Sequence, residues 1–465
     1  MKKLMQIEMS MLRTGVALAV ALFCGLSVRS ERIELSAAFG CYGIELPDFP
    51  RREFRIDDYG ARTGELCTTA INAAMRECSL SGGGRVVVPR GAWITGAVHL
   101  RSGCMLWLDE GAVLEFTDNP ADYPVVQTAW EGVECLNHSP LVYAFGATNV
   151  AVCGKGTLVS KMDRWRVWFE RTPQHLAATE MLYHWGATNA PLSVRNVAML
   201  PDANVRPHLM QFNRCSRVLL DGFKIRESPF WTIHLFHSED CILRNLDSRA
   251  HGFNSDGVDV EMTKNVLVEN CRFDQGDDGI VLKAGRNQDA WRLARPTENV
   301  IVRNCEFVSA DTLMAVGSEL SGGIRNVHLH DCRISRAHNL LHIKTNRRRG
   351  GFVENVTVEN VAVSNVNTAV FALRTDVLYQ WARFPDYELR RTAISNISLN
   401  NIYARCADYA FEITGDIELP PKGLHFRNVR VDSVRKEFSK IVNVHDVTCR
   451  DVSLGSMTPI PWRRK

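Results

Sequence analysis

The sequence has little net charge, and its apolar segments are short. Its 55 basic and 52 acidic residues leave a formal charge of +3, which is too small to indicate a nucleic-acid partner. The N-terminal apolar run Gly15–Leu26 is shorter than the ~20 residues that a membrane-spanning helix needs, so no membrane span is expected. With 45% hydrophobic and 23% charged residues, the composition is that of an ordinary globular protein.

Paired cysteine motifs are also missing, although the chain has 14 cysteines. No two cysteines have C-x-x-C spacing, so a zinc or redox site of that type is not indicated, and we expect neither a metal nor a cofactor. Cys271, Cys305 and Cys332 occupy the same place in successive copies of a repeat. Because equivalent positions stack, we expect a column of buried thiols rather than disulfides.

The N-terminus indicates an exported protein. Lys2 and Lys3 precede the apolar run Gly15–Leu26, a pattern typical of a signal peptide, which we place at residues 1–30. The protein is therefore expected in the periplasm or outside the cell. A buried helix is an alternative interpretation of the run, and a lipoprotein anchor at Cys24 is disfavoured by the bulky residue before it.

A short repeat dominates the rest of the chain. Its form is Asn-Val-x-Val-x-Asn-Cys/Val followed by a hydrophobic residue, and copies start at positions 149, 217, 241, 265, 299, 326, 355, 396 and 428. One set of short strands per copy, with loops of variable length between copies, predicts a β-solenoid, here a parallel β-helix. The recurrent asparagines are expected to form a hydrogen-bonded column along its axis.

The repeats predict one all-β domain over residues 54–465, preceded by a linker at residues 31–53. A short amphipathic helix in the stretch CTTAINAAMREC, which starts at Cys67, is expected to cap the first coil and cover its unpaired edge. Two insertions break the period, at about 160–207 and 376–392, and the first is expected to be partly helical. These insertions are consistent either with the wall of a binding cleft or with plain cover.

Two hexapeptides in the middle of the chain have matching patterns. DGVDVE starts at Asp256 and DGIVLK starts at Asp278, and each alternates apolar with outward-pointing residues as a strand does. Stacked one coil apart, they place the two aspartates together on the outer face, and they place Glu261 beside Lys283 as a cross-strand ion pair. We therefore expect the functional site at these two coils.

Asp277 adds a third carboxylate to this group. It is adjacent to Asp278, and the flanking Gly276 and Gly279 allow the backbone to turn both side chains outward. Crowded carboxylates repel, so one of them should hold a proton near neutral pH, as a general acid must. An acid and a base ~6.5 to 9.5 Å apart are what inverting glycoside hydrolysis requires, and Asp256 one coil away is expected to supply that spacing. Calcium needs more oxygen ligands than these.

Several stretches resemble one known family. They are DYGA near position 58, GGGRVVVPRGAWITGAVHL, RPHLMQFNRC, SPFWTIHL, the NSDG that starts at Asn254, the QGDDGI around Asp277, and GSELSGGIRNV. From about Phe54 to past Val361 the chain resembles family 28 of the glycoside hydrolases, the polygalacturonases and related pectin-degrading enzymes. The resemblance implies a right-handed parallel β-helix that hydrolyses galacturonide linkages with inversion.

The resemblance also implies roles for individual residues. Asp277 is expected to be the general acid, while Asp256 and Asp278 position and activate the attacking water. Asn254, which opens the NSDG motif, is expected to contact the substrate. The implied partner is a pectic polysaccharide or an oligogalacturonide.

Two motifs depart from the family pattern. Thr312 stands where the family has a histidine in a Gly-His-Gly setting, and His342 stands where it has the arginine of Arg-Ile-Lys. Lys344, the lysine of that second motif, is retained. In the family these positions support the acid and bind the substrate carboxylate, so we expect the departures to affect the choice of substrate.

Stacking of the strands predicts a positively charged column. Lys283, Gly317 and Lys344 fall at equivalent positions of successive coils, and the glycine leaves a gap in which an anionic sugar fits. Pairing of Lys283 with a neighbouring glutamate is an equally good interpretation for that lysine. His342 is expected to flank the same site, and Arg286 is expected to add positive potential.

The sequence therefore predicts an exported, inverting glycoside hydrolase that acts on a galacturonic-acid-containing substrate. The first insertion is expected to block one end of the cleft, which favours exo action. A β-helix polysaccharide lyase and a non-catalytic carbohydrate-binding β-helix are the alternatives, and the three retained aspartates argue against the second. The oligomeric state and the aglycone sugar are not predicted.

Overall fold

The computed structural model describes residues 31–378 and 388–455. The expected signal peptide, residues 1–30, lies outside the described residues, as does most of the second expected insertion. From Arg32 onward the chain forms one compact unit. No helix in the described parts of the chain is long and apolar enough to cross a membrane.

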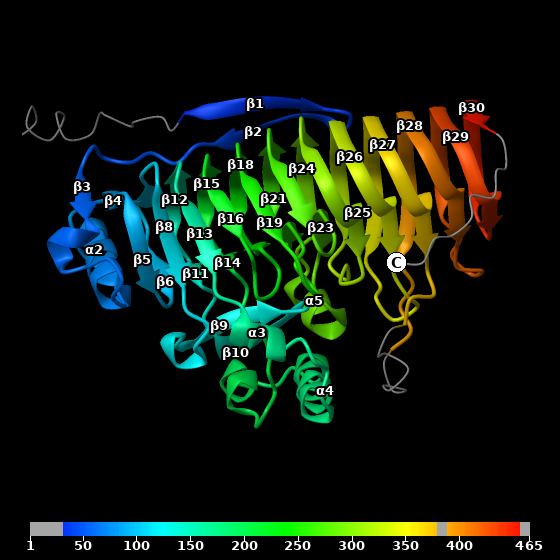
Figure 1. The fold of residues 1–465 in the computed structure, drawn as a ribbon. Helices are drawn as coiled ribbons and strands as arrows, with labels where there is room; N and C mark the ends of the chain where they lie inside the picture. Colours follow the sequence, from blue (N-terminus) through cyan, green and yellow to red (C-terminus); the bar gives the residue numbers. More distant parts are fainter. Residues whose placement is uncertain (1–30, 379–387, 456–465) are drawn as a thin grey trace, which may run out of the picture. The chain divides into compact units, whose positions relative to one another are not determined.

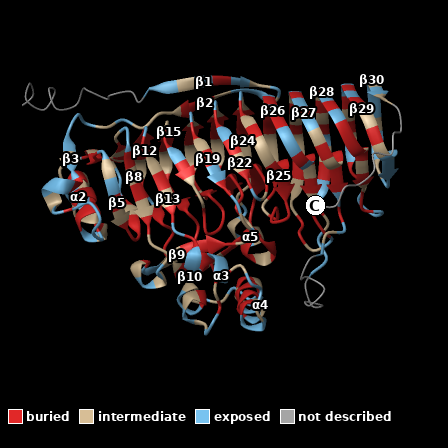
Figure 2. Ribbon diagram, viewed as in Figure 1, coloured by how far each residue is buried: buried red, intermediate tan, exposed pale blue. Residues whose placement is uncertain are grey.

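The strands build a right-handed parallel β-helix, as the repeats predict (Figure 1). Each strand of the β-helix pairs in parallel with the strand one coil further along the chain. Buried positions recur along the coils (Figure 2), and their apolar residues form a continuous core. The strands of the first coils are β3 (Glu53–Arg55), β4 (Gly84–Val88), β5 (Gly91–Thr95), β6 (Val98–Leu100), β7 (Cys104–Leu108), β8 (Ala112–Phe116), β11 (Val142–Phe145), β12 (Thr148–Gly154) and β13 (Thr157–Ser160).

The central coils carry the two hexapeptides. Their strands are β14 (Met210–Asn213), β15 (Ser216–Asp221), β16 (Lys224–Arg226), β17 (Ile233–Phe236), β18 (Glu239–Arg244), β19 (Asp247–Ala250), β20 (Val258–Glu261), β21 (Lys264–Glu269), β22 (Arg272–Gln275), β23 (Ile280–Lys283) and β24 (Thr297–Arg303). The last coils contain longer, nearly continuous strands: β25 (Glu306–Gly317), β26 (Ile324–Lys344), β27 (Phe352–Arg374), β28 (Ala393–Thr414), β29 (Lys422–Val442) and β30 (His445–Leu454).

The predicted register of the two hexapeptides is confirmed. Strands β20 and β23 pair in parallel with Val258 beside Ile280 and Glu261 beside Lys283. The predicted ion pair between the last two residues is wrong, however. The Lys283 ammonium bonds instead to Glu319, because a long side chain can reach past its neighbour in the sheet to a carboxylate from a later coil.

Stacked asparagines form the expected hydrogen-bonded column. The Asn299 side chain donates to Asn265 at 3.0 Å, Asn326 donates to Asn299 at 3.1 Å, and Asn355 donates to Asn326 at 3.1 Å. Each of these asparagines has a positive φ, between 56° and 59°, a conformation that asparagine tolerates better than most residues. The motif therefore serves both the turn between strands and the contact between coils, at ~0.5–1.5 kcal/mol for each hydrogen bond.

The cysteines of the repeat are buried free thiols. Cys271, Cys305 and Cys332 are all buried, and none of the cysteines in the described residues forms a disulfide. Their thiols lie beside main-chain carbonyls in the core. The expected column of small hydrophobic residues is confirmed.

The N-terminal part covers two exposed surfaces of the β-helix. Helix α2 (Thr68–Leu80) packs against the first coil, where Ile71, Met75 and other apolar residues are fully buried. Residues 31–53, expected to be a linker, contain an antiparallel hairpin of β1 (Arg32–Ala37) and β2 (Gly40–Glu45). The hairpin packs on a row of outward-facing apolar residues of the β-helix, which it shields from water.

The first expected insertion is partly helical. It contains α3 (Asp163–Val167), α4 (Pro173–Ala187) and two short 3-10 helices, Leu192–Val194 and Val197–Met199. A second, unpredicted excursion precedes it, the antiparallel hairpin of β9 (Val125–Trp130) and β10 (Val133–His138). Contacts join α4 to β10, so these elements form one additional layer beside the central coils, and α5 (Asn287–Leu293) packs against both (Figure 1). We call this layer, residues 125–138 and 160–207, the insertion layer.

Candidate active site

A pocket of about 490 Å³ lies between the insertion layer and the central coils. The insertion layer contributes an aromatic wall to it, formed by Trp130, Trp168, Phe169 and Tyr183. The coils contribute mainly charged side chains, among them Asp256, Asp277, Asp278, Lys283, Arg286 and Lys344. Pockets that bind small molecules measure ~300–1,000 Å³, so this one is large enough for a short saccharide.

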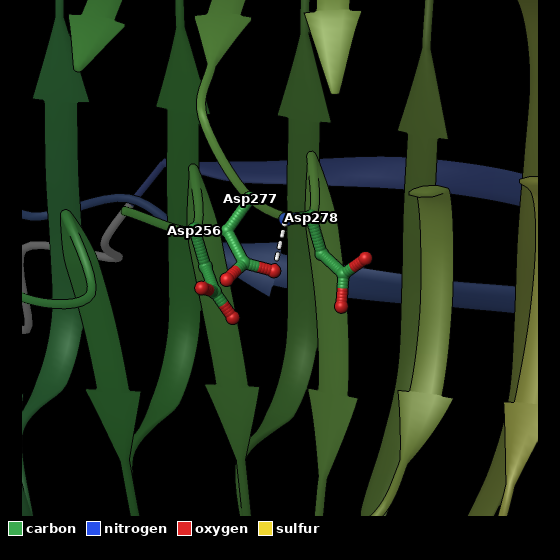
Figure 3. A group of neighbouring side chains, drawn as sticks. All are labelled: Asp256, Asp277 and Asp278. Atoms are coloured by element: carbon green, nitrogen blue, oxygen red, sulfur yellow. Dashed lines mark hydrogen bonds between the residues drawn. The ribbon is translucent and has the colours of Figure 1, made fainter. Parts of the chain in front are cut away.

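The three predicted aspartates converge at this pocket (Figure 3). Asp256 lies just before β20, and Asp277 and Asp278 lie just before β23. One carboxylate oxygen of each lies within 4.8 Å of the others. The expected spacing of ~6.5–9.5 Å is therefore wrong, and the physical reason is that residues in register on adjacent coils are held at the strand separation of ~4.8 Å.

Asp277 has the environment of a general acid. Its Oδ2 accepts a hydrogen bond from the Asn254 main-chain N–H at 3.0 Å, and its Oδ1 accepts one from the Asp278 N–H at 2.9 Å (Figure 3). Burial and the negative charge of Asp278 raise the pKa of Asp277 to about 6, although Lys344 opposes the shift. The carboxyl is therefore held in a fixed orientation and keeps its proton in weakly acidic solution.

Asp278 is held in the opposite charge state. Its burial raises the pKa, but the Lys344 ammonium, 2.9 Å from Oδ2, outweighs that effect and brings the pKa below its ordinary value. The Thr312 hydroxyl lowers the pKa further. Two adjacent carboxyl groups thus differ in charge, which is the arrangement that acid–base catalysis requires.

Asp256 is the most shielded of the three. Burial, followed by the charges of Asp259 and Asp277, raises its pKa well above the ordinary range. Its Oδ1 is buried without a hydrogen-bond partner among the described residues, and so are both carboxylate oxygens of Asp259. A carboxyl group in such an environment is neutral unless a ligand or water satisfies it.

A buried ion network supports the pocket from one side. Glu319 is its centre: Lys283 donates to it at 3.1 Å, Arg286 donates to it at 2.6 Å, and Arg349 lies 3.4 Å away. Because three cations surround one carboxylate, the pKa of Glu319 lies far below its ordinary value despite its burial. Arg286 also bonds to Glu131, and the network therefore joins the insertion layer to the coils.

The predicted column of lysines exists in a modified form. Lys344 pairs in register with Gly317. On the coil before, Leu282 pairs with Val316, so Lys283 is the next residue after the last paired position. Both lysines border the pocket, but Lys283 is fixed by Glu319 and lies over the Trp231 ring, 4.4 Å from its centre.

The two departures from the family pattern, Thr312 and His342, do not border the pocket. Thr312 is buried and acts on Asp278 rather than bordering the pocket. His342 is largely shielded, and burial together with the charge of Lys344 lowers its pKa to about 4, so its imidazole is neutral. Neither side chain is among the residues that line the pocket, so their expected contacts with the substrate stay predictions.

Asn254 has two roles, and the second involves Arg206, which the sequence motifs do not indicate. Its N–H holds Asp277, and its side-chain oxygen accepts a hydrogen bond from Arg206 at 2.9 Å. Arg206 and Glu319 are both in stretches of the sequence that match the family, but nothing in those stretches indicates a charge network. Only the packing of the insertion layer brings Glu131 to the same place.

The three aspartates are also the only cluster in the described residues that offers ligands to a metal ion. They provide three carboxylate oxygens, whereas calcium prefers six to eight oxygen ligands. Lys344 already donates to one of these carboxylates, and a cation there would face its positive charge. The donor set is thus poor for calcium.

A parallel β-helix with crowded carboxylates at an open pocket is the architecture of a carbohydrate-active hydrolase. The profile of the glycosyl hydrolases family 28 matches residues 195–450, more than half of the chain. The chain belongs to that family, and it is a glycosidase.

Individual relatives agree with this assignment. A probable polygalacturonase of Vitis vinifera is 24% identical over 425 residues, covering 87% of this chain and 79% of the relative. An exo-poly-α-D-galacturonosidase of Dickeya chrysanthemi is 26% identical over 396 residues, and the match covers 78% of this chain but only 64% of that protein.

Solved structures resemble the whole described unit. An exopolygalacturonase from Thermotoga maritima has a TM-score of 0.82 and 31% identity, covering 90% of this chain and 95% of that one. A family 28 exopolygalacturonase from Yersinia enterocolitica has a TM-score of 0.73 at 21% identity, covering 93% and 81%. The second similarity concerns the fold alone.

Proposed function

We propose that the protein hydrolyses galacturonide bonds of pectic polysaccharides or oligosaccharides with inversion, from the end of the chain. One observation carries the proposal: Asp256, Asp277 and Asp278 converge at a single pocket with Lys344 beside them. Similarity to an exopolygalacturonase and to an exo-poly-α-D-galacturonosidase supports the choice of linkage and substrate.

In this proposal the charge states assign the roles. Asp277, which keeps its proton, protonates the leaving glycosidic oxygen, and ionised Asp278 takes the proton of the attacking water. Asp256 holds the same water through its unsatisfied carboxyl oxygen. Inversion requires that this water attack the anomeric carbon on the face opposite to the leaving oxygen.

A pH profile tests the charge states. We expect kcat/KM to fall as pH rises through about 6, because Asp277 then loses the proton that it must donate. On the acid side the loss should come only below the ordinary pKa of an aspartate, where Asp278 becomes protonated. In Lys344→Met the acid limb should move to higher pH, because the charge that lowers the pKa of Asp278 is gone. An unmoved acid limb contradicts the assignment of the base.

Exo action is supported by the position of the insertion layer. Glu131, Phe169 and Tyr183 border the pocket from that layer, and in this proposal they stop the polysaccharide chain from continuing in that direction. We expect one short product at all times when oligogalacturonides of defined length are digested and separated by anion-exchange chromatography. A ladder of mid-sized products at early times contradicts exo action.

A further inference from the structure

Arg206 is a buried cation at the edge of the pocket. It is 5% exposed, and it follows the last helix of the insertion layer. Its Nη1 donates to the main-chain carbonyls of Pro229 at 2.8 Å and Phe253 at 2.7 Å, and its Nη2 donates to the Asn254 side chain. All three acceptors are neutral, so the positive charge has no carboxylate in contact with it.

The surroundings of Arg206 make this charge costly. The guanidinium lies over the rings of Phe169 and Phe230, 4.5 and 5.0 Å from their centres, and its Nε is buried without a partner in the described residues. Burial lowers the pKa of Arg206 to about 9, yet the group remains charged at neutral pH. Buried charges are normally paired, and an exception at a pocket indicates a ligand.

Three other cations at the pocket already have counter-charges. Lys283 and Arg286 share Glu319, and Lys344 bonds to Asp278. Neutralising a substrate carboxylate with any of them requires that an existing ion pair weaken. Arg206 has no ion pair to weaken, although Glu131, Asp256 and Asp277 are near enough for their charges to act on it.

A second arginine faces the same pocket. Arg171 is exposed, precedes α4 and borders the pocket, and no ion pair connects it to a carboxylate in the described parts of the chain. It is close enough to Arg206 for its charge to lower the pKa of that residue. Two like charges that repel across a pocket are stabilised by an anion between them.

We propose that Arg171 and Arg206 form a carboxylate subsite on the insertion side of the pocket, which takes the free carboxylate of the terminal uronic acid unit. The proposal rests on the proposed function and extends it, because it makes a charged terminal unit a condition for good turnover. In this subsite Phe169 lies against the Arg206 guanidinium and excludes water from one of its faces. The insertion layer thus selects the sugar as well as closing the pocket.

The test compares wild-type protein with Arg171→Gln on two oligogalacturonides, one with a free terminal carboxylate and one with that group methyl-esterified. Charge-assisted hydrogen bonds predict a loss of kcat/KM of about 10- to 100-fold for Arg171→Gln on the free substrate. Esterification of the terminal carboxylate should lower kcat/KM of the wild type by a similar factor and should change kcat/KM of Arg171→Gln little. Arg171→Lys, which keeps the charge, should recover part of the loss.

Arg164→Gln is the matched control, because Arg164 is an exposed arginine of the same layer that does not border this pocket. It should retain kcat/KM within about 2-fold. If the wild type hydrolyses the free substrate and Arg171→Gln does so equally well, the subsite is wrong while the proposed function stands.

A binding measurement separates the two proposals if turnover is absent. Galacturonate and neutral galactose are titrated calorimetrically into the wild type and into Arg171→Gln. The subsite predicts that the wild type prefers galacturonate and that the variant loses this preference. Equal affinity of both proteins for galacturonate overturns the subsite, whereas absence of turnover with every galacturonide overturns the proposed function alone.

Discussion

Replacing Asp277 by asparagine is expected to lower kcat by about 10²- to 10⁴-fold, the range that general acid–base catalysis contributes. An amide has nearly the shape of the carboxyl group, but it has no proton to give to a leaving oxygen. Of the two main-chain N–H groups that orient Asp277, those of Asn254 and Asp278, one still finds an acceptor in the amide oxygen. Initial rates of reducing-sugar release from polygalacturonate measure the effect.

Asp274→Asn provides the control for that loss. Asp274 lies on the neighbouring β22, is partly buried and pairs with Arg249 and His251 rather than bordering the pocket. This variant should retain nearly full activity, and both variants should keep the circular dichroism spectrum of the wild type. Full activity of Asp277→Asn contradicts the assignment of Asp277 as the general acid.

The largest expected effect on stability comes from Glu319→Gln. Glu319 is 6% exposed and neutralises Lys283, Arg286 and Arg349, so its loss leaves three buried cations without their shared counter-charge. Removing one partner of a buried ion pair costs about 3–5 kcal/mol, and we expect the free energy of unfolding to fall by at least that range. Urea denaturation followed by tryptophan fluorescence measures the change.

A surface ion pair makes the matched comparison. Glu306 bonds to Arg333 at 3.0 Å, but the side chain of that arginine is 72% exposed. Exposed pairs contribute about 0–1 kcal/mol, so Glu306→Gln should unfold almost as the wild type does. If both substitutions lower the free energy of unfolding equally, the network around Glu319 is no stronger than a surface ion pair. That result contradicts its role in supporting the pocket.

The β-helix follows from the sequence because its determinants are local and repeated. Alternating apolar residues set the faces of each strand, and the stacking of Val258 on Ile280 needs only the spacing of two similar hexapeptides. Asparagines such as Asn299 mark the turns and also bond to the next coil. Each copy of the repeat supports the same strand register, so the register found for two neighbouring coils also predicts how the other coils stack.

The charge network does not follow from the sequence, because it joins residues with no common pattern. Glu131 and Glu319 meet through Arg286, although 188 positions separate the two glutamates in the chain. The insertion layer that carries Glu131 has no period. Strand register places Lys283 beside Glu261, but its long side chain reaches Glu319 of a later coil instead.

The aspartate cluster follows from the sequence only in part. Register alone brings Asp256 and Asp278 to one pocket, whereas their charge states depend on burial and on Lys344, which the hexapeptides do not reveal. The expected wide spacing failed for a related reason, since the coil separation limits how far the two groups can move apart. Strand register therefore predicts which residues meet, whereas the general acid is assigned only by the resemblance to the family.

The stereochemistry of the first product tests the central claim most directly. Carboxylates this close are nearer the ~5–5.5 Å typical of retaining enzymes than the spacing typical of inverting ones, so distance alone does not decide between direct attack by water and a covalent intermediate. Proton NMR of trigalacturonate during its first turnovers by the wild type decides it. Direct attack of water held by Asp256 and Asp278 predicts that the β-anomer of the newly formed reducing end appears first. Initial release of the α-anomer contradicts this mechanism, and an unsaturated product contradicts hydrolysis itself.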